Sequence, residues 1–232
     1  MPHPVTTSWI TIPDAGEAWL CLPPAGRGPG LVLYQEIFGV NAHVRAVAEQ
    51  FALAGFVVLA PDVFWRQAPR VELGYEGEDR QRGIALAGML QPEQVAADLA
   101  AWTLALRGRS VTGGSRIGAI GYCMGGRLAY LAAALTGVDA AVAYYGGGIH
   151  NQLPLAARIA CPMQFHYAER DDHIPPEAVQ TVREAFAGKP AEVHVYPGSM
   201  HGFNCWDRAS YHPASAALAL GRSLSFLAER LF

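Results

Sequence analysis

The stretch Gly121-Tyr122-Cys123-Met124-Gly125-Gly126 decides the fold, because it joins a predicted strand over 116–122 to a predicted helix over 124–135. Glycines two residues before and two residues after Cys123 allow a tight, strained turn in which larger side chains would clash with the strand and helix. The turn would hold Cys123 at the strand end, beside the positive end of a helix dipole that favours a thiolate. We interpret Cys123 as a nucleophile.

Two other interpretations of this turn were considered, a purely structural cysteine and a phosphate-binding loop. A phosphate or dinucleotide site would need the G-x-G-x-x-G spacing or a P-loop lysine, and the sequence after Gly121 has neither. A buried cysteine without chemistry stays open from the sequence alone. The nucleophile interpretation accounts for both the glycine spacing and the strand-to-helix context.

On both sides of this turn, apolar runs alternate with amphipathic stretches, which is typical of a mostly parallel sheet wrapped by helices. Further strands are predicted over 31–36, 56–60, 140–145, 163–167 and 192–196, and further helices over 43–54, 92–106, 177–186 and 215–231. Residues 64–90 carry the charged run EGEDRQR and no clear strand, so we expect an excursion over the strand ends. No repeat or linker divides the chain, so we expect a single domain over residues 1–232.

Composition narrows the function classes. Of the 232 residues, 51% are hydrophobic and 16% are charged, and the net charge is −3, so neither extended disorder nor a basic nucleic-acid footprint is expected. We predict no signal peptide and no membrane span, and therefore a cytoplasmic protein. The cysteines lack zinc-site spacing, and Cys21 and Cys161 are predicted to be reduced, buried hydrophobes. Small neutral or anionic molecules are the expected partners, with no nucleic acid and no membrane.

A nucleophile for acyl transfer needs a base, and that base needs a carboxylate to orient it. The order nucleophile, acid, histidine is satisfied by Asp171 and His201, each in a loop that follows a predicted strand. Asp172 is an alternative to Asp171, which we prefer because it lies four residues before Pro175 in a D-x-x-[IV]-P turn. The other histidines considered are His166, His173 and His194; a metal cluster of His166, His173, His201 and Cys205 lacks any H-x-x-x-H or C-x-x-C pair.

Glu36 ends the predicted strand over 31–36. In folds with a nucleophile turn of this kind, the loop after such a strand supplies the second backbone N–H group that binds the oxyanion. We therefore expect the backbone N–H groups of Ile37 and Met124 to stabilise the negative oxygen of a tetrahedral intermediate. A glutamate beside them is unexpected, because its charge would oppose an oxyanion. A solvated carboxylate at the strand end is the other interpretation of Glu36.

The chain resembles the dienelactone hydrolase family (carboxymethylenebutenolidases) from about Gly30 to the last helix. The resemblance is carried by QEIFGVN at 35–41, GYCMGG at 121–126, AYYG at 143–146 and the loops of Asp171 and His201. It implies an α/β-hydrolase fold with a mostly parallel sheet of about eight strands flanked by helices, and no cofactor or metal. It also implies that Glu36 hydrogen-bonds the resting Cys123 thiol until substrate binding rearranges it, and that Phe38 and Tyr145 contact substrate.

The resemblance fails at two positions that bear on the substrate. Family members bind a lactone carboxylate through two arginines; Arg82 matches the first, whereas Cys205 occupies the second position. The tyrosine expected four residues after Arg82 is Leu86. Whether Arg208 replaces the missing cation cannot be read from the sequence, so an anionic lactone is expected to bind about tenfold to a hundredfold more weakly, the equivalent of one charge-assisted hydrogen bond.

The sequence therefore predicts a cysteine-dependent hydrolase of small lactones or carboxylic esters, with Cys123, His201, Asp171 and Glu36 as its catalytic residues. A broad carboxylesterase or thioesterase is the second hypothesis. A binding protein without catalysis is the third, and the intact set of Cys123, Asp171 and His201 argues against it. We expect a monomer or a small homo-oligomer; the physiological substrate and the pathway are not determined by the sequence.

Overall fold

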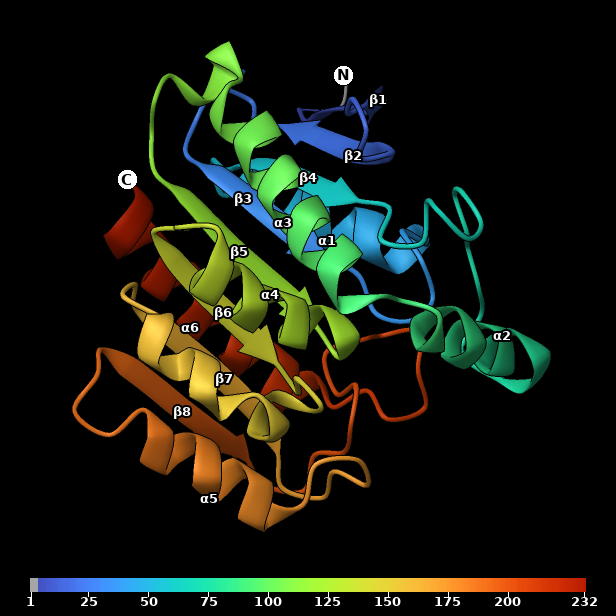
Figure 1. Cartoon of the computed structure of the whole chain (residues 1–232), viewed down its shortest axis with the longest axis vertical. Helices are drawn as coiled ribbons and strands as arrows, with labels where there is room; N and C mark the ends of the chain where they lie inside the picture. Colours follow the sequence, from blue (N-terminus) through green and yellow to red (C-terminus); the bar gives the residue numbers. More distant parts are fainter. Residues whose placement is uncertain (1–3) are drawn as a thin grey trace.

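The computed structural model describes residues 4–232 and contains one eight-stranded sheet with the strand order β1-β2-β4-β3-β5-β6-β7-β8 (Figure 1). Strand β2 is antiparallel to both of its neighbours, and the strands from β4 to β8 run parallel to one another. The strands are β1 (Thr6–Thr11), β2 (Glu17–Leu22), β3 (Gly30–Tyr34), β4 (Val57–Pro61), β5 (Ile117–Tyr122), β6 (Ala140–Tyr144), β7 (Met163–Ala168) and β8 (Ala191–Tyr196).

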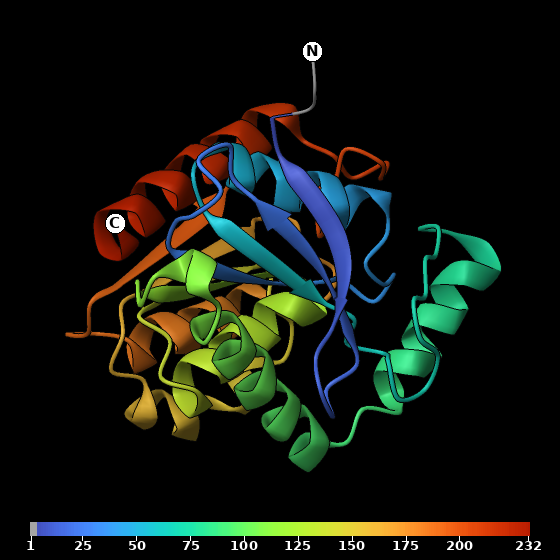
Figure 2. The same cartoon turned by 90° about the horizontal axis from the view of Figure 1, so that it is seen from above.

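Helices cover both faces of this sheet (Figure 2). Helices α1 (Ala42–Leu53) and α6 (Pro213–Leu231) lie on one face, and α3 (Pro92–Arg107), α4 (Met124–Leu135) and α5 (Pro176–Ala185) lie on the other. Short 3-10 turns occur at Ser110–Thr112, Ile149–Asn151 and Leu153–Arg158. Strands β3, β4, β5, β6 and β7 are buried along their whole length, as expected of parallel strands covered on two sides. The predicted α/β-hydrolase architecture is confirmed.

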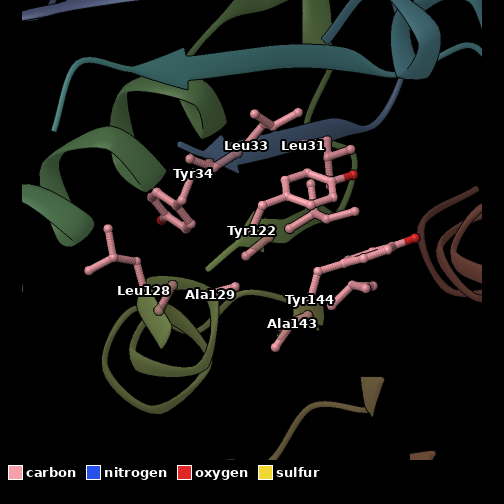
Figure 3. Packing of buried hydrophobic residues seen from close by; sticks show 14 of the residues in the cluster. Leu31, Leu33, Tyr34, Tyr122, Leu128, Ala129, Ala143 and Tyr144 are labelled. Carbon is pink, nitrogen blue, oxygen red and sulfur yellow. The ribbon is translucent and has the colours of Figure 1, made fainter. Parts of the chain in front are cut away.

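The core lies where α4 packs on the middle of the sheet (Figure 3). Leu31, Leu33 and Tyr34 of β3 are buried beside Tyr122 of β5 and Tyr144 of β6. The rings of Tyr122 and Tyr144 have centroids 4.6 Å apart, and Leu128 and Ala129 bring α4 onto this layer. The turn at Cys123 therefore follows a strand that is buried along its whole length. None of the helices between residues 4 and 232 is long and apolar enough to cross a membrane.

The hairpin of β1 and β2 was not among the strands predicted from the residues. Its Trp9 pairs with Trp19 at a ring-centroid distance of 5.6 Å, and its turn places Asp14 and Gly16 at φ values of 57° and 75°. Strand β1 lies at the sheet edge and is mostly exposed, so its sequence TTSWIT lacks the continuous apolar run of the central strands.

The structure differs from the prediction over 64–90, because part of this excursion is the helix α2 (Gly77–Gly88). Only Gly83 and Leu86 of α2 are buried, so the helix has no apolar stripe by which its sequence could have been recognised. Figures 1 and 2 show α2 standing out from the body of the fold. Strand β3 also ends at Tyr34, which leaves Gln35 and Glu36 in the loop after it. The other predicted elements match their observed counterparts to within two residues.

Candidate active site

Cys123 lies at the turn between β5 and α4 with φ 55° and ψ −117°, a left-handed conformation that a side chain rarely adopts. The turn is held by close backbone packing: a Cβ on Gly121 would collide with the Gly125 backbone, and one on Gly125 would collide with the end of β3. A Cβ on Gly126 would lie 2.5 Å from the Tyr144 carbonyl oxygen. The glycine spacing is therefore required sterically, and strain of this kind often marks a functional residue.

The loop after β7 places Asp171 against His201 from the loop after β8. The His201 Nδ1 atom lies 2.9 Å from Asp171 Oδ2 and 3.1 Å from Oδ1. The Asp171 side chain is fully buried, and the backbone N–H groups of His173 and Ile174 donate to its Oδ1 atom at 2.9 and 3.1 Å. The alternative, Asp172, has a side chain that is 68% exposed. Asp171 is thus fixed as the partner that orients the imidazole.

Charge balance in this site favours the protonated form of His201. Burial opposes the imidazolium, but the neighbouring Cys123 and the Asp171 carboxylate outweigh it and raise the pKa of His201 to about 10. Asp171 occupies Nδ1 of His201, and a hydrogen bond with the Cys123 side chain on the other side of the ring also contributes to the raised pKa. An imidazolium hydrogen-bonded to a cysteine is the counter-ion that a thiolate nucleophile requires.

The rival histidines have other surroundings. His166 is fully buried, with Nδ1 2.7 Å from the Tyr196 hydroxyl and Nε2 2.8 Å from Gln164 Oε1, so both ring nitrogens are occupied and a metal at His166 is not supported. His194 pairs with Glu192 at 3.1 Å. His173 does reach the site: its ring lies edge-on to His201 at a centroid distance of 4.8 Å.

Glu36 is buried beside the site and only 2% exposed, which excludes the solvated strand-end carboxylate. Burial raises the pKa of Glu36, against the opposing effect of Arg208, whose Nη1 atom lies 3.3 Å from Glu36 Oε1. The Oε2 atom has no partner between residues 4 and 232. The family resemblance implies a hydrogen bond from the Cys123 thiol to the Glu36 carboxylate. In this structure Glu36 instead forms an ion pair with Arg208.

Arg208 reaches Glu36 from seven residues after the catalytic histidine, whereas the family pattern places a cation four residues after it. The guanidinium passes directly over Gly202, where a Cβ would lie 2.6 Å from its Cζ atom. Its Cζ also lies 5.8 Å from the Phe38 ring centroid and 5.9 Å from that of Tyr75. The sequence could not place Arg208, because a loop residue's direction depends on contacts distant in the chain.

Cys205 and Leu86, the two departures from the family pattern, are both buried. Burial and the Glu36 carboxylate raise the pKa of the Cys205 thiol to about 12, and this thiol is hydrogen-bonded to Tyr75. Tyr75 also accepts a 3.0 Å hydrogen bond from Asn41 Nδ2 and packs its ring 4.6 Å from that of Phe38. Tyr75 thus supplies a phenol near Glu36 that sequence reasoning missed, since it lies inside the excursion.

Arg82 is the predicted site residue that the structure connects least to the others. Its side chain is exposed on α2, and the part of the chain that the structure describes gives its guanidinium neither an ion pair nor a hydrogen bond. A role in binding a carboxylate therefore stays a prediction for Arg82. Arg208, by contrast, is half-buried and contacts Glu36 and Phe38.

The expected oxyanion donors lie at adjacent backbone segments. Strands β3 and β5 are paired with Tyr34 opposite Gly121, so the loop through Ile37 and the turn through Met124 leave the same edge of the sheet. Met124 is the first residue of α4, where N–H groups have no intrahelical acceptor. Within residues 4–232, neither the Ile37 nor the Met124 N–H group donates a hydrogen bond. Both donors are free for a ligand oxygen.

Tyr145 closes the site on the side of β6. It has φ 34°, its ring centroid is 5.0 Å from that of His201, and its buried hydroxyl has no partner in the described residues. The Glu36 carboxylate contributes, after burial, to raising the pKa of Tyr145. Two buried polar atoms without partners in the described residues thus belong to this site: Glu36 Oε2 and Tyr145 Oη. Such groups are rare in native proteins and require an explanation.

A parallel sheet in this strand order, with a strained residue at the strand-to-helix turn and a paired histidine and aspartate in later loops, defines an α/β-hydrolase. A family model described as the dienelactone hydrolase family matches residues 17–231, and the chain belongs to this family. It is accordingly a hydrolase of ester or lactone bonds.

Similar proteins support this membership along nearly the whole chain. A carboxymethylenebutenolidase of Pseudomonas putida is 36% identical over 208 residues, covering 89% of this chain and 88% of that protein. One from Cupriavidus pinatubonensis is 32% identical over 213 residues, covering 91% and 90%. A crystal structure from Klebsiella pneumoniae, described provisionally as a dienelactone hydrolase, has 30% identity and a TM-score of 0.86 over 97% of this chain and 99% of its own.

Proposed function

We propose that this hydrolase opens small lactones and cleaves small carboxylic esters through a covalent thioester on Cys123. The Cys123 sulfur attacks the carbonyl carbon, and the carbonyl oxygen becomes an oxyanion bound by the Ile37 and Met124 N–H groups. The oxyanion then collapses, the carbon–oxygen bond of the ester breaks, and His201 gives its Nε2 proton to the departing alkoxide. His201 next takes a proton from water, whose oxygen displaces the Cys123 thiolate and releases the acid. No cofactor takes part in these steps.

The observation that carries this proposal is the imidazole of His201, which is held by buried Asp171 at Nδ1 and hydrogen-bonded to the Cys123 side chain. His166, by contrast, has both of its ring nitrogens on Tyr196 and Gln164 and contacts no nucleophile. The raised pKa of His201 supplies the proton that the leaving alkoxide needs near neutral pH. A cysteine in a strained turn, beside a helix N-terminus, completes the arrangement.

Glu36 fits this chemistry only because Arg208 is present. A buried carboxylate next to the Ile37 N–H group would repel the oxyanion, and the guanidinium 3.3 Å away balances its charge. Arg208 is also the half-buried cation of this site that could bind a substrate carboxylate, with the Phe38 and Tyr75 rings beside it. We propose Arg208, in place of residue 205, as the group that recognises an anionic lactone.

A second candidate, a broad carboxylesterase or thioesterase, is favoured by one observation. Arg208 is already paired with Glu36, and Arg82 is exposed. The site therefore offers a substrate carboxylate one arginine that already has a partner, instead of two unpaired arginines. Selectivity for an anionic substrate would then be weak. A binding role without catalysis is less consistent with the intact pair of Asp171 and His201.

The test is a panel of substrates that pairs carboxylate-bearing lactones with neutral lactones and p-nitrophenyl esters, assayed with wild type and Cys123→Ala. Turnover of lactones that disappears in Cys123→Ala is expected. Comparable kcat/KM for anionic and neutral substrates would favour the broad esterase. Turnover of both classes that survives in a folded Cys123→Ala protein would contradict the proposal.

A further inference from the structure

The loop that carries the proposed oxyanion donor, residues 36–40, is fastened on one side by the excursion that contains α2. Gly39 forms an isolated antiparallel bridge with Glu72, and the Leu73 N–H group donates to the Phe38 carbonyl oxygen at 2.9 Å. The Asn41 side chain also donates to the Leu73 carbonyl oxygen at 3.3 Å. The approach is so close at Gly39, which has φ 82°, that a Cβ there would overlap the Val71 carbonyl oxygen.

Helix α2 touches the same loop through Gly83. A Cβ built on Gly83 would lie 2.5 Å from the Ile37 carbonyl oxygen and 3.3 Å from its carbonyl carbon, closer than real Cβ atoms approach backbone oxygens. Gly83 is in the interior of a helix, where alanine is intrinsically preferred to glycine. The conformation of α2 therefore gives no reason for a glycine at this position, whereas the contact with Ile37 does.

We infer that Gly83 is a positioning residue for the oxyanion hole: the Cα of Gly83 is the surface against which the Ile37 backbone rests. This inference rests on the proposed function, in which the Ile37 N–H group binds the oxyanion. The carbonyl in contact with Gly83 and that N–H group are joined through the Ile37 Cα, so a displacement of the Ile37 backbone at the contact also moves the N–H group. Oxyanion donors must lie about 2.7–3.1 Å from the developing charge, so a shift of a few tenths of an ångström is enough to weaken them.

Helix α2 has few buried contacts with the rest of the protein besides the one between Gly83 and Ile37. Of its twelve residues, only Gly83 and Leu86 are buried, and Ile84 is 51% exposed. An alanine at 83 must therefore move either the peripheral helix or the Ile37 loop. The proposed role of Gly83 requires the second movement. The bonds at Gly39, Phe38 and Asn41 join the loop to the start of the same excursion, so the two segments are mechanically connected.

The experiment compares Gly83→Ala with Gly88→Ala, a matched control at the last residue of α2, where a Cβ would meet nothing within 4 Å. Three quantities are measured for each variant: kcat and KM for an ester, the rate of Cys123 alkylation by iodoacetamide, and the Tm. Alkylation displaces iodide and forms no oxyanion, so it reports the Cys123 and His201 pair without the Ile37 donor.

Gly83→Ala is expected to lower kcat by about tenfold to a hundredfold, somewhat less than the loss of a whole oxyanion donor. KM, the alkylation rate and the Tm should stay close to wild type, and Gly88→Ala should change none of them except for a small gain in Tm. Leu86→Ala loosens α2 and with it the surface that supports Ile37, so it should lower kcat measurably, by a smaller factor than Gly83→Ala.

Unchanged kcat in Gly83→Ala would overturn the inference, because α2 would then have yielded instead of Ile37. Equal losses in kcat and in alkylation rate would also overturn it, since the effect would not be specific to the oxyanion. If Gly83→Ala does not fold, a kcat of Leu86→Ala that equals or exceeds the wild-type value would likewise overturn the inference. Failure of the proposed function itself is recognised separately, by turnover that survives in Cys123→Ala.

Discussion

The two sides of the active site are built by different means. The proposed catalytic side, with Cys123, Asp171 and His201, is carried by the turn and loops that follow the parallel strands β5, β7 and β8. The proposed substrate side, with Phe38, Tyr75 and Arg208, is assembled from three loops far apart in the chain, and its ion pair joins residues 172 positions apart. On this proposal, chemistry depends on short segments at strand ends, whereas recognition depends on long-range packing.

This difference explains why the cation beside Glu36 can come from position 208 and not from position 205. The glycines at 121, 125 and 126 pack on backbone atoms, so the turn that carries Cys123 tolerates little displacement. A cation that is needed only as a charge near Glu36 can come from any loop that reaches it. Arg208 fills that need three residues later in the chain than residue 205, where a buried cysteine stands.

The largest effect is expected on the catalytic side, at the nucleophile. Cys123→Ala should lower kcat/KM by at least about 1,000-fold, because the covalent route is lost. Cys123→Ser should also be far poorer than wild type, since a hydroxyl has no comparable anionic population near neutral pH. Steady-state kinetics with circular dichroism as a folding control measures both. A Cys123→Ala enzyme whose kcat/KM is within a few-fold of wild type would show that Cys123 is not the nucleophile, and the distinction between a catalytic side and a substrate side would no longer hold.

The next effect concerns Asp171 and the dependence of kcat/KM on pH. With the pKa of His201 raised to about 10, the imidazolium persists at neutral pH, and activity should decline only as pH rises through about 10. Asp171→Asn removes one cause of this raised pKa, so it should move the alkaline decline to lower pH and reduce kcat by about 100- to 10,000-fold. A wild-type decline centred near pH 7 in the pH profile would refute the assignment.

On the substrate side, Arg208→Gln should weaken selection of an anionic substrate. The ratio of kcat/KM for a carboxylate-bearing lactone to that for its neutral analogue should fall by about tenfold to a hundredfold, the value of one charge-assisted hydrogen bond. Arg82→Gln is the matched variant at an exposed arginine and should change the ratio by no more than about twofold. The opposite ranking, with Arg82 dominant, would restore the expectation from the family pattern and leave Arg208 as a partner of Glu36 alone.

The smallest effect is on stability. Arg208→Gln leaves the Glu36 carboxylate buried without its partner, and the free energy of unfolding at neutral pH should fall by about 1.5–3 kcal/mol. The double variant Glu36→Gln with Arg208→Gln should recover part of this loss, because no buried charge remains. Urea denaturation gives both values. A double variant less stable than Arg208→Gln would show that the pair is not the main interaction of either side chain.

Sequence reasoning was strongest where a backbone constraint acts over a few residues. The strand-to-helix turn at Cys123 and the loops of Asp171 and His201 could be predicted because buried parallel strands and glycine spacing leave a clear pattern. The edge hairpin of β1 and β2 gives no such pattern, since β1 is mostly exposed. Helix α2 was missed for the same reason, and with it Tyr75 and the contact of Gly83 with Ile37. The direction of Arg208 depends on Gly202 and Glu36 together, and neither position alone indicates it.

The central claim, that Cys123 forms the covalent intermediate, is tested most directly by mass spectrometry of the enzyme quenched in acid during turnover of a slowly hydrolysed ester. The account predicts an added mass equal to the acyl group, located by peptide mapping on Cys123, and greater accumulation in Asp171→Asn. An acyl group on another residue, or no adduct in an enzyme that is turning over while the same quench preserves a synthetic thioester, would contradict it.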